Sequence, residues 1–332
     1  MLAASHALGQ IDDVPGLIDL LLETEAVGMR ILAPGETSDA PPGVIRVLAH
    51  RTGVVPNDIG DADIALTTDP AASAPWVQVD DIDAELARLA SLFAAQPIAA
   101  SVAAQVFRTG QRLDFASAIL VESLAYSMLL TSAGFADWRK ANAASRSRAD
   151  TGPAVVVERE AGALVITLNH PKARNAMTAE MRDALCDALA FAEADPHAAP
   201  VILRGRGASF STGGDLAEFG TASDVAAAHL IRTLRSAATI LHRIAGRSTA
   251  ILHGPCIGSG LEIPLAAARV LARPGTRFRL PEVGMGLIPG AGGTVTLARR
   301  IGRQRACWMA VGGGELDCAT ALRWGLIDGI QQ

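Results

Sequence analysis

Aromatic and charged residues are scarce in this chain, and their scarcity excludes several classes of function. Of its 332 residues, 4% are aromatic and 19% are charged, and the formal net charge is −5. A nucleic-acid-binding surface usually needs clustered basic residues and aromatic rings on which bases can stack. We therefore expect no nucleic-acid partner. Because 50% of the residues are hydrophobic, the chain can bury a substantial core, and global disorder is not expected.

Paired cysteines and long apolar segments are also missing. The chain has no C-x-x-C pair and no His/Cys cluster with the spacing of metal ligands. Residues 1–10 lack the pattern of a secretory signal, and charges interrupt every apolar stretch well before ~20 residues. We therefore expect no metal site, no membrane partner, a cytoplasmic location and four free thiols, which are those of Cys186, Cys256, Cys307 and Cys318.

Hydrophobic patterning predicts a different arrangement in each half of the chain. In the first half it indicates a helix, four short strands and then three helices. These elements are expected over residues 14–27, then 30–33, 44–48, 63–67 and 76–79, and then from Asp81, over 98–109 and over 114–132.

The second half alternates strands and helices. A strand pair is expected over 154–158 and 163–168, followed by a helix over 178–194 with Thr178 as its N-cap. Further strands are expected over 201–204 and 248–252, with helices over 225–244 and 260–268. This alternation predicts an α/β fold with stacked crossover units.

Two glutamates that follow glycine-rich turns are the strongest candidates for chemistry. Glu262 ends the segment 254–262, and Glu282 lies near the start of the glycine-rich segment 280–293. A third glycine turn lies upstream, over 210–215. Two carboxylates can exchange protons with a substrate, and tight turns can present backbone N–H groups to a developing oxyanion.

In this order, the motifs resemble those of the enoyl-CoA hydratase/isomerase (crotonase) superfamily. The resemblance runs from about Ala154 to about Ile330 and includes the segments 169–177 and 319–328. It implies a spiral core of ββα units and an acyl-CoA substrate. It also implies no cofactor beyond the coenzyme A that the substrate carries, and a homo-oligomer, either a trimer or a hexamer.

The same resemblance implies roles for individual residues. Glu262 would hold and activate water, and Glu282 would exchange the proton at Cα of the thioester. The backbone N–H groups of Gly214 and Ser259 would form the oxyanion hole, although many relatives have glycine where Ser259 stands. Two segments would contact coenzyme A, through Lys172, Ala173, Arg174, Ala176, Ser211, Gly213, Asp215 and Leu216.

The implied reaction is the reversible hydration of a trans-2-enoyl-CoA in fatty acid metabolism. Isomerisation, thioester hydrolysis, decarboxylation and a non-catalytic assembly role stay open as alternatives. A solvated basic loop would account equally well for Lys172 and Arg174, and Asp215 is expected to fix its own turn. The acyl chain is expected to lie against residues 216–225 and the N-terminal helices. The segment 289–294 lacks the Walker lysine, which argues against an NTPase.

The order of the two halves is unusual for this superfamily. Its members usually continue past the motif ending at Asp328 with helices that cover the active site. Here residues 76–140 resemble that helical tail, placed before a linker over 141–153 and the core over 154–332. We hypothesise that residues 1–75 are a degenerate crotonase-like half or small α/β segment. The helical subdomain would pack on the core, in cis or from a neighbouring chain; an unrelated N-terminal α/β domain is the alternative.

Overall fold

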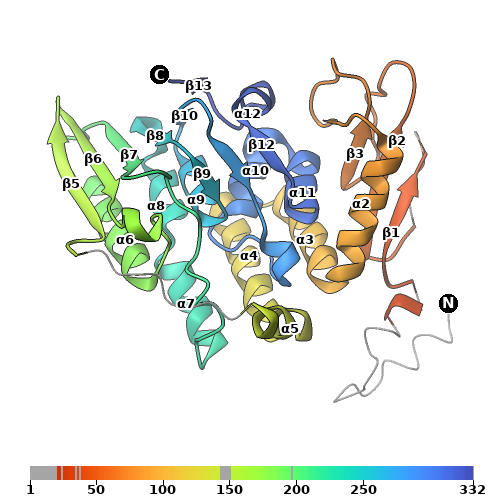
Figure 1. Cartoon of the computed structure of the whole chain (residues 1–332), viewed down its shortest axis with the longest axis horizontal. Helices are drawn as coiled ribbons and strands as arrows, with labels where there is room; N and C mark the ends of the chain where they lie inside the picture. Colours follow the sequence, from red (N-terminus) through yellow and green to blue (C-terminus); the bar gives the residue numbers. More distant parts are fainter. Residues whose placement is uncertain are drawn as a thin grey trace.

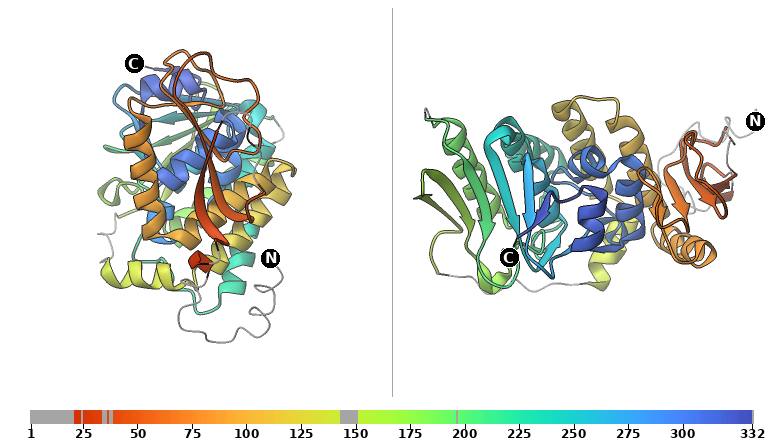
Figure 2. Two further views of the ribbon diagram at one scale, coloured as in Figure 1. Left: turned by 90° about the vertical axis from the view of Figure 1, so that its right-hand side faces the viewer. Right: turned by 90° about the horizontal axis from the view of Figure 1, so that it is seen from above.

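The chain folds into a mixed α/β structure with a parallel sheet at one end and a mostly parallel sheet at the other. The computed structural model describes residues 21–331 apart from 24, 34–35, 37–38, 143–150 and 196. A four-stranded sheet from the N-terminal part lies at one end, and a six-stranded sheet extends to the other (Figure 1). Figure 2 shows helices from both halves of the chain between the two sheets. The predicted α/β class is therefore confirmed.

The N-terminal sheet consists of parallel strands in the order β1-β2-β3-β4, close to the predicted positions. These strands are Val27–Leu32, Gly43–His50, Ile64–Thr67 and Val77–Gln78. The helix predicted over 14–27 falls largely on residues outside the described part. Its predicted end is wrong, because Val27 pairs with Gly43 as the first residue of β1.

Four helices follow, and each of their starts except that of α3 has a side-chain cap. They are α2 (Ile82–Ala95), α3 (Pro97–Gly110), α4 (Phe115–Leu129) and α5 (Ala133–Ala141). Ser132, predicted to end the helix before it, instead caps α5 by accepting a hydrogen bond from the N–H of Phe135 at 3.3 Å. Of the predicted linker, residues 143–150 lie outside the described part, and Ala141 still belongs to α5.

The second half forms the six-stranded sheet, ordered β13-β10-β8-β7-β6-β5, and a smaller sheet, ordered β12-β11-β9. In the larger sheet only the pair β5–β6 is antiparallel. Its strands are β5 (Val155–Glu160), β6 (Ala163–Leu168), β7 (Val201–Gly205), β8 (Ser248–Leu252), β10 (Arg269–Ala272) and β13 (Gly329–Ile330). The smaller sheet contains β9 (Pro255–Ile257), β11 (Arg277–Arg279) and β12 (Glu315–Asp317).

Two predicted helices in this half are wrong in extent. The helix expected over 225–244 is broken into α7 (Val225–Leu234) and α8 (Ala237–Arg243), because the Ser236 side chain caps a new start by accepting from Thr239 N at 3.2 Å. The helix expected over 260–268 is only the turn α9 (Ser259–Glu262). Pro264 has no N–H to continue it, and a 3₁₀ turn, η3 (Pro264–Ala266), follows.

The described part of the second half has four further helices, of which the second and third pack on helices of the first half. They are α6 (Ala179–Glu193), for which Thr178 is the N-cap as predicted, α10 (Gly293–Ile301), α11 (Arg303–Gly312) and α12 (Cys318–Trp324). Helices α3 and α4 pack on α10, and α2 and α3 pack on α11. One continuous cluster of buried apolar side chains runs through both halves. The helical region 76–140 therefore packs on the core of its own chain, while its origin as a displaced tail stays a prediction.

A buried carboxylate reinforces this junction. Asp63, at the start of β3, is fully buried and accepts hydrogen bonds from Arg108 Nε of α3 and Arg303 Nη1 of α11, both at 2.8 Å. It also accepts a hydrogen bond from the backbone N–H of Arg46 at 2.9 Å. One carboxylate thus holds together an N-terminal strand, an N-terminal helix and a C-terminal helix.

Two further expectations concern cysteines and membranes. All four cysteines are buried and free, as predicted. In the described part of the chain, no single helix is long and apolar enough to cross a membrane. The sharply bent pairs α2 with α3 and α4 with α5 reach the required length and composition only when each pair is taken together.

Candidate active site

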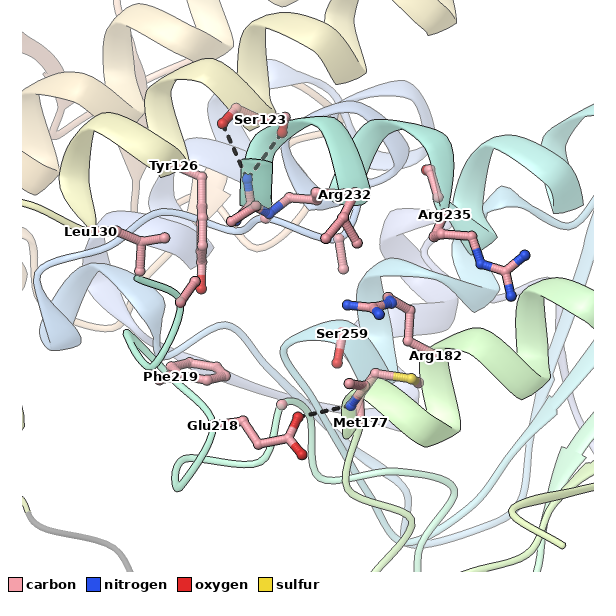
Figure 3. Close-up of a pocket in the computed structure, with 18 of the residues that line it drawn as sticks. Ser123, Tyr126, Leu130, Met177, Arg182, Glu218, Phe219, Arg232, Arg235 and Ser259 are labelled. Atoms are coloured by element: carbon pink, nitrogen blue, oxygen red, sulfur yellow. Dashed lines mark hydrogen bonds between the residues drawn. The ribbon is translucent and has the colours of Figure 1, made fainter. Parts of the chain in front are cut away.

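A pocket of about 590 Å³ lies where the two halves of the chain meet (Figure 3). One wall consists of core residues, among them the predicted Gly214, Ser259, Glu262 and Glu282. Another wall comes from α4, and the rest from α6, α7 and the loop before α7. The lining residues from this part of the chain include Ile119, Glu122, Ser123 and Tyr126 of α4 and Leu130, which directly follows the helix.

Close contact between two glycine turns builds the core wall. The N–H of Ile257 donates to the carbonyl of Ser211 at 3.2 Å. A side chain at Gly260 would collide with that carbonyl, and one at Gly213 would come within 2.7 Å of the Ile257 oxygen. Gly213 also has a φ of +86°, in the region that favours glycine. These positions therefore need glycine for the turns to approach each other.

The predicted oxyanion donors both lie outside the regular hydrogen-bond pattern. A short parallel bridge joins Met177 to the upstream turn through Met177 N with Gly213 O and Asp215 N with Met177 O, at 2.7 and 3.3 Å. Neither bond uses the N–H of Gly214. Ser259 is the first residue of α9, so its N–H has no partner within that helix. Both residues line the pocket, so their N–H groups can serve a ligand there.

Glu262 is buried at the end of α9 and is fixed by backbone donors. Its Oε2 accepts hydrogen bonds from Ala291 N at 2.7 Å and Gly293 N at 2.9 Å, at the start of α10. The residue is 2% exposed. Its other oxygen, Oε1, has no recorded hydrogen bond within the described chain.

Glu282 lies at the start of the 3₁₀ turn η4 (Glu282–Met285) and is also buried. Its Oε2 is buried without a hydrogen-bond partner among the described residues. A side chain at Gly258 would collide with Oε1 of Glu282 and lie 3.9 Å from Oε1 of Glu262. The two predicted carboxyl groups therefore border the same glycine, immediately before Ser259.

A third carboxyl group, that of Glu122, was missed by the sequence analysis. It projects from α4, is 1% exposed, and accepts from Gly292 N at 2.7 Å and Thr294 N at 2.8 Å. Thr294 Oγ1 also donates to it at 2.7 Å. Its partners lie about 170 residues away in the sequence. The only available signal was an acidic residue in the strongly apolar stretch 115–130.

Burial dominates the electrostatics of the three carboxyl groups. It raises the pKa of Glu282 to about 8, and the charge of Glu122 adds to the rise. Burial raises the pKa of Glu122 to about 7 against the opposing effect of its Thr294 and Gly292 donors. The pKa of Glu262 is also raised by burial, and further by the charges of Glu282 and Glu122, although its two N–H donors oppose this. The cluster therefore holds exchangeable protons near neutral pH.

The residues predicted to contact coenzyme A lie beside this pocket, and none of them is among its lining residues. Ser211 is fully buried; its hydroxyl donates to Asn175 O at 2.7 Å and accepts from Gly213 N at 3.2 Å. Asp215 accepts from Ala217 N at 2.9 Å, so it fixes its turn as expected. Lys172 and Ala173 lie in a 3₁₀ turn (Pro171–Ala173), followed by Arg174 with a φ of +52° and by Ala176.

The loop before α7 covers the glycine turn. The ring of Phe219 lies against Gly214, where any side chain at that position would collide with it. Arg139 of α5 donates to Gly220 O at 2.6 Å and so ties this loop to the N-terminal helices. Of the predicted acyl-binding stretch 216–225, residues 218–225 line the pocket, whereas Leu216 is 44% exposed and does not.

Comparison with known proteins agrees with the fold of the C-terminal half. The family model for enoyl-CoA hydratase/isomerase matches residues 158–331, and the chain belongs to this crotonase family. The N-terminal half lies outside the matched segment.

Two curated relatives are hydratases of CoA thioesters. A mevalonyl-coenzyme A hydratase from Beauveria bassiana is 33% identical over 175 residues, which are 50% of this chain and 62% of that protein. A 2,3-dehydroadipyl-CoA hydratase from Escherichia coli is 32% identical over 176 residues, 53% of this chain and 68% of that protein. The chain therefore spans roughly two thirds of the length of these relatives.

Solved structures match the same half. The enoyl-CoA hydratase from Thermoplasma volcanium has a TM-score of 0.50 and 30% identity, over 54% of this chain and 72% of that chain. DspI from Pseudomonas aeruginosa also gives a TM-score of 0.50 with 30% identity, over 57% of this chain and 72% of that chain. The crotonase fold is thus shown for the C-terminal half.

Proposed function

We propose that the protein is an enoyl-CoA hydratase, which adds water reversibly across the Cα–Cβ double bond of a trans-2-enoyl-CoA. The observation that carries the proposal is the pair of buried carboxyl groups, Glu262 and Glu282, that border Gly258 in a pocket also lined by Gly214 and Ser259. Two similar proteins, which are named as hydratases of CoA thioesters, support it.

In the proposed reaction, the thioester oxygen accepts hydrogen bonds from the N–H groups of Gly214 and Ser259. These donors stabilise the negative charge that develops when oxygen adds to Cβ. Glu262 accepts a proton from the attacking water, and protonated Glu282 delivers a proton to Cα. Exchange with solvent then returns one proton to Glu282 and removes one from Glu262, so that one water molecule is consumed in each turnover.

The raised pKa of Glu282 suits its role as the acid. With a pKa of about 8, Glu282 is largely protonated at neutral pH and can serve as an acid. Glu262 has two N–H donors that favour its charged form, whereas Oε2 of Glu282 has no partner among the described residues. A reaction that needs one carboxyl group would leave the second buried without a use, so hydration is favoured over isomerisation, thioester hydrolysis and decarboxylation.

We propose that coenzyme A enters with the substrate along the two segments identified by resemblance, with no further cofactor. The backbone of the loop from Lys172 to Ala176 and the turn from Ser211 to Leu216 would contact it. Arg174 is exposed, so its charge is accessible to phosphate groups. A cytoplasmic location is the corresponding expectation, to be tested by cell fractionation.

We further propose that α2–α5 take the place of the helical tail that other crotonases carry after the core. The contacts of α3 and α4 with α10 support this proposal. Without them, the apolar faces that these helices cover on α10 and α11 would be exposed. Deletion of residues 1–150 should therefore give an insoluble protein, and a soluble, folded fragment would contradict the proposal.

A homo-oligomer is also proposed. Helix α4 exposes three apolar side chains at intervals of one turn, Leu120, Leu124 and Met128, with exposed fractions of 46–56%. Leu230 and Leu234 of the adjacent α7 are 58% and 78% exposed. Such a patch is typical of a protein–protein contact. Analytical ultracentrifugation should show a trimer or hexamer that dissociates when Leu124 and Leu234 are both changed to Glu.

The direct test of function uses crotonyl-CoA and the absorbance of its conjugated thioester. The purified protein should remove this absorbance, and Glu262→Gln and Glu282→Gln should each reduce the rate by at least about 100-fold. Glu158→Gln, on the exposed face of β5, is the matched control and should keep full activity. If both active-site substitutions leave the rate unchanged, the assignment of acid and base is wrong.

A further inference from the structure

One cation of the pocket, Arg232, has no hydrogen bond or ion pair with an acidic side chain in the described chain, although the charge of Glu122 acts favourably on it from a distance. Arg232 extends from α7 to α4, where its Nη1 donates to Ser123 Oγ at 3.1 Å, Ser127 Oγ at 2.9 Å and, weakly, Ser123 O at 3.4 Å (Figure 3). Its guanidinium also stacks on the ring of Tyr126, 4.4 Å from the ring centre. Its recorded partners are thus two serines and a tyrosine, all neutral hydroxyl-bearing residues.

The geometry leaves most of the hydrogen-bonding capacity of Arg232 unused. A guanidinium has five N–H donors, and all three recorded hydrogen bonds leave from Nη1. Nε and Nη2 have no recorded acceptor in the described chain. Burial lowers the pKa of this guanidinium from its usual value, because the charge is held in a poorly solvated place. A structural link between α4 and α7 would not by itself require a charged group with free donors.

The two neighbouring arginines, Arg182 and Arg235, differ from Arg232 because each of them has an acidic partner. Arg182 of α6 directs its guanidinium into the pocket, and its charge acts unfavourably on Arg232 (Figure 3). Its only recorded acidic contact is through Nε, to Asp183 at 2.9 Å. Arg235 follows α7 but points away, where Asp183 and Asp187 neutralise it at 3.3 and 2.7 Å. All three arginines line the pocket, but only Arg235 is neutralised by two carboxylates.

From this arrangement we infer that the pocket binds acyl-CoA substrates whose acyl chain ends in a carboxylate, with Arg232 as the specificity-determining residue. The inference rests on the proposed function in taking an acyl-CoA as the ligand. A planar carboxylate matches the N–H fork formed by Nε and Nη2. It would also relieve the repulsion between Arg232 and Arg182. The chain between this carboxylate and the thioester would lie against the apolar lining residues Ile119, Ile231 and Ala228.

A phosphate of coenzyme A is the other anion that an acyl-CoA could place here. The segments proposed to contact coenzyme A belong to the core and carry basic residues of their own, Lys172 and Arg174. Arg232 instead reaches from α7 to α4, in the same pocket as residues 218–225 of the stretch 216–225 that was expected to receive the acyl chain. The acyl terminus is therefore the favoured source, and the experiment separates the two.

The test measures binding of two saturated thioesters that cannot be hydrated, adipyl-CoA and hexanoyl-CoA, by isothermal titration calorimetry. They have equal chain lengths and the same coenzyme A, and only adipyl-CoA ends in a carboxylate. The full-length wild-type protein should bind adipyl-CoA at least about tenfold more tightly. Arg232→Met should bring the ratio of the two Kd values close to one, whereas Arg232→Lys should retain part of the preference.

Arg235→Met is the matched control and should keep the wild-type ratio, because Asp183 and Asp187 already neutralise its guanidinium. A wild-type ratio near one overturns the inference, and so does an absence of binding by either thioester. Equal weakening of both thioesters by Arg232→Met assigns the residue to a coenzyme A phosphate and also overturns it. Turnover of crotonyl-CoA is measured separately, so a failure of hydration with the Kd ratio preserved would remove the proposed function alone.

Discussion

Glu122 and Glu262 bind alternate N–H groups at the start of one helix. Glu262, from the core, accepts from Ala291 and Gly293, while Glu122, from the N-terminal half, accepts from Gly292 and Thr294. Both carboxyl groups thus occupy the positive end of α10, where unpaired N–H groups favour negative charge. The position of Glu262 depends on a helix start that Glu122 holds in place.

We predict that Glu122 acts as a positioning residue for Glu262. Glu122→Gln weakens the hydrogen bonds that Glu122 accepts from Gly292 and Thr294 at the start of α10. It should lower kcat by about 10- to 100-fold, with a smaller effect on KM. The substitution also removes a charge that raises the pKa values of Glu262 and Glu282, so the pH–rate profile should move to lower pH. Thr294→Ser keeps the hydroxyl donor and serves as the control. An unshifted pH profile would leave Glu122 with a purely structural role.

A second prediction isolates the backbone N–H of Ser259. Proline is well tolerated at the first position of a helix, and Gly258 before it, with a φ of +52° and a ψ of −126°, has no side chain to clash with the ring. Ser259→Pro therefore removes the N–H with little other change and should lower kcat by about 10²- to 10³-fold.

Ser259→Ala is the matched comparison for this proline variant. The Ser259 hydroxyl is buried without a hydrogen-bond partner in the described chain, so its loss should leave kcat nearly unchanged and should not reduce stability. Circular dichroism and thermal unfolding would confirm that both variants fold. Equal activity of the two variants would exclude the Ser259 N–H from the oxyanion hole.

A third prediction concerns the pH dependence of stability. Glu282 has a pKa of about 8 in the folded protein and 4.5 as its ordinary value, so between these values the folded state holds a proton that the unfolded state releases. Its contribution to stability is complete below about pH 4.5 and is lost as the pH rises through 8. Within this window, Glu282→Gln should reduce the decline of unfolding free energy by up to about 1.4 kcal/mol per pH unit.

Urea unfolding at pH 5, 6, 7, 8 and 9 would measure this difference. Glu158→Gln provides the control for the general effect of removing an exposed carboxylate and should leave the slope as in the wild type. Parallel curves for Glu282→Gln and the wild type would mean that the Glu282 carboxyl ionises in the folded protein much as it does in the unfolded chain.

The fourth prediction concerns the junction between the two halves. Asp63→Ala leaves the Arg108 and Arg303 guanidinium groups without their shared carboxylate and should cost about 3–5 kcal/mol of stability. Asp83→Ala removes the exposed partner of Arg51 and should have a far smaller effect. Thermal unfolding of both variants would compare them, and equal losses would contradict the importance of the buried network.

The features that could be predicted from the sequence are those encoded by neighbouring residues. Thr178 can be recognised as an N-cap from the residues that follow it. The glycine turn before Ser259 and Glu262 can be recognised from the glycines within a few positions of these residues. The end of α9 could also have been predicted from a neighbouring residue, because Pro264 cannot continue the helix. The prediction of a helix through residue 268 did not take this proline into account. By contrast, the break between α7 and α8 depends on the side chain of Ser236 turning back to cap a second helix.

Long-range partners are the features that sequence patterns left out. The sequence around Glu122 does not indicate that its carboxyl group accepts a hydrogen bond from Gly292. Likewise, the sequence around Arg232 does not indicate that its Nη1 donates to the hydroxyl groups of Ser123 and Ser127. Periodicity shows that α4 is a strongly apolar helix, but it does not say which of its residues will face a pocket. The second wall of the site therefore became visible only in three dimensions.

The placement of α4 ahead of the core also determines the order in which the two walls of the pocket are synthesised. A chain is made from its N-terminus, and domains tend to fold in that order. Here the wall that carries Glu122 and Tyr126 leaves the ribosome long before α10, which supplies the N–H groups that Glu122 requires. A nascent chain thus carries the Glu122 carboxyl group without its hydrogen-bond donors until Gly292 and Thr294 have been synthesised. Assembly of the pocket consequently waits for α10, although one of its walls is synthesised about 170 residues earlier.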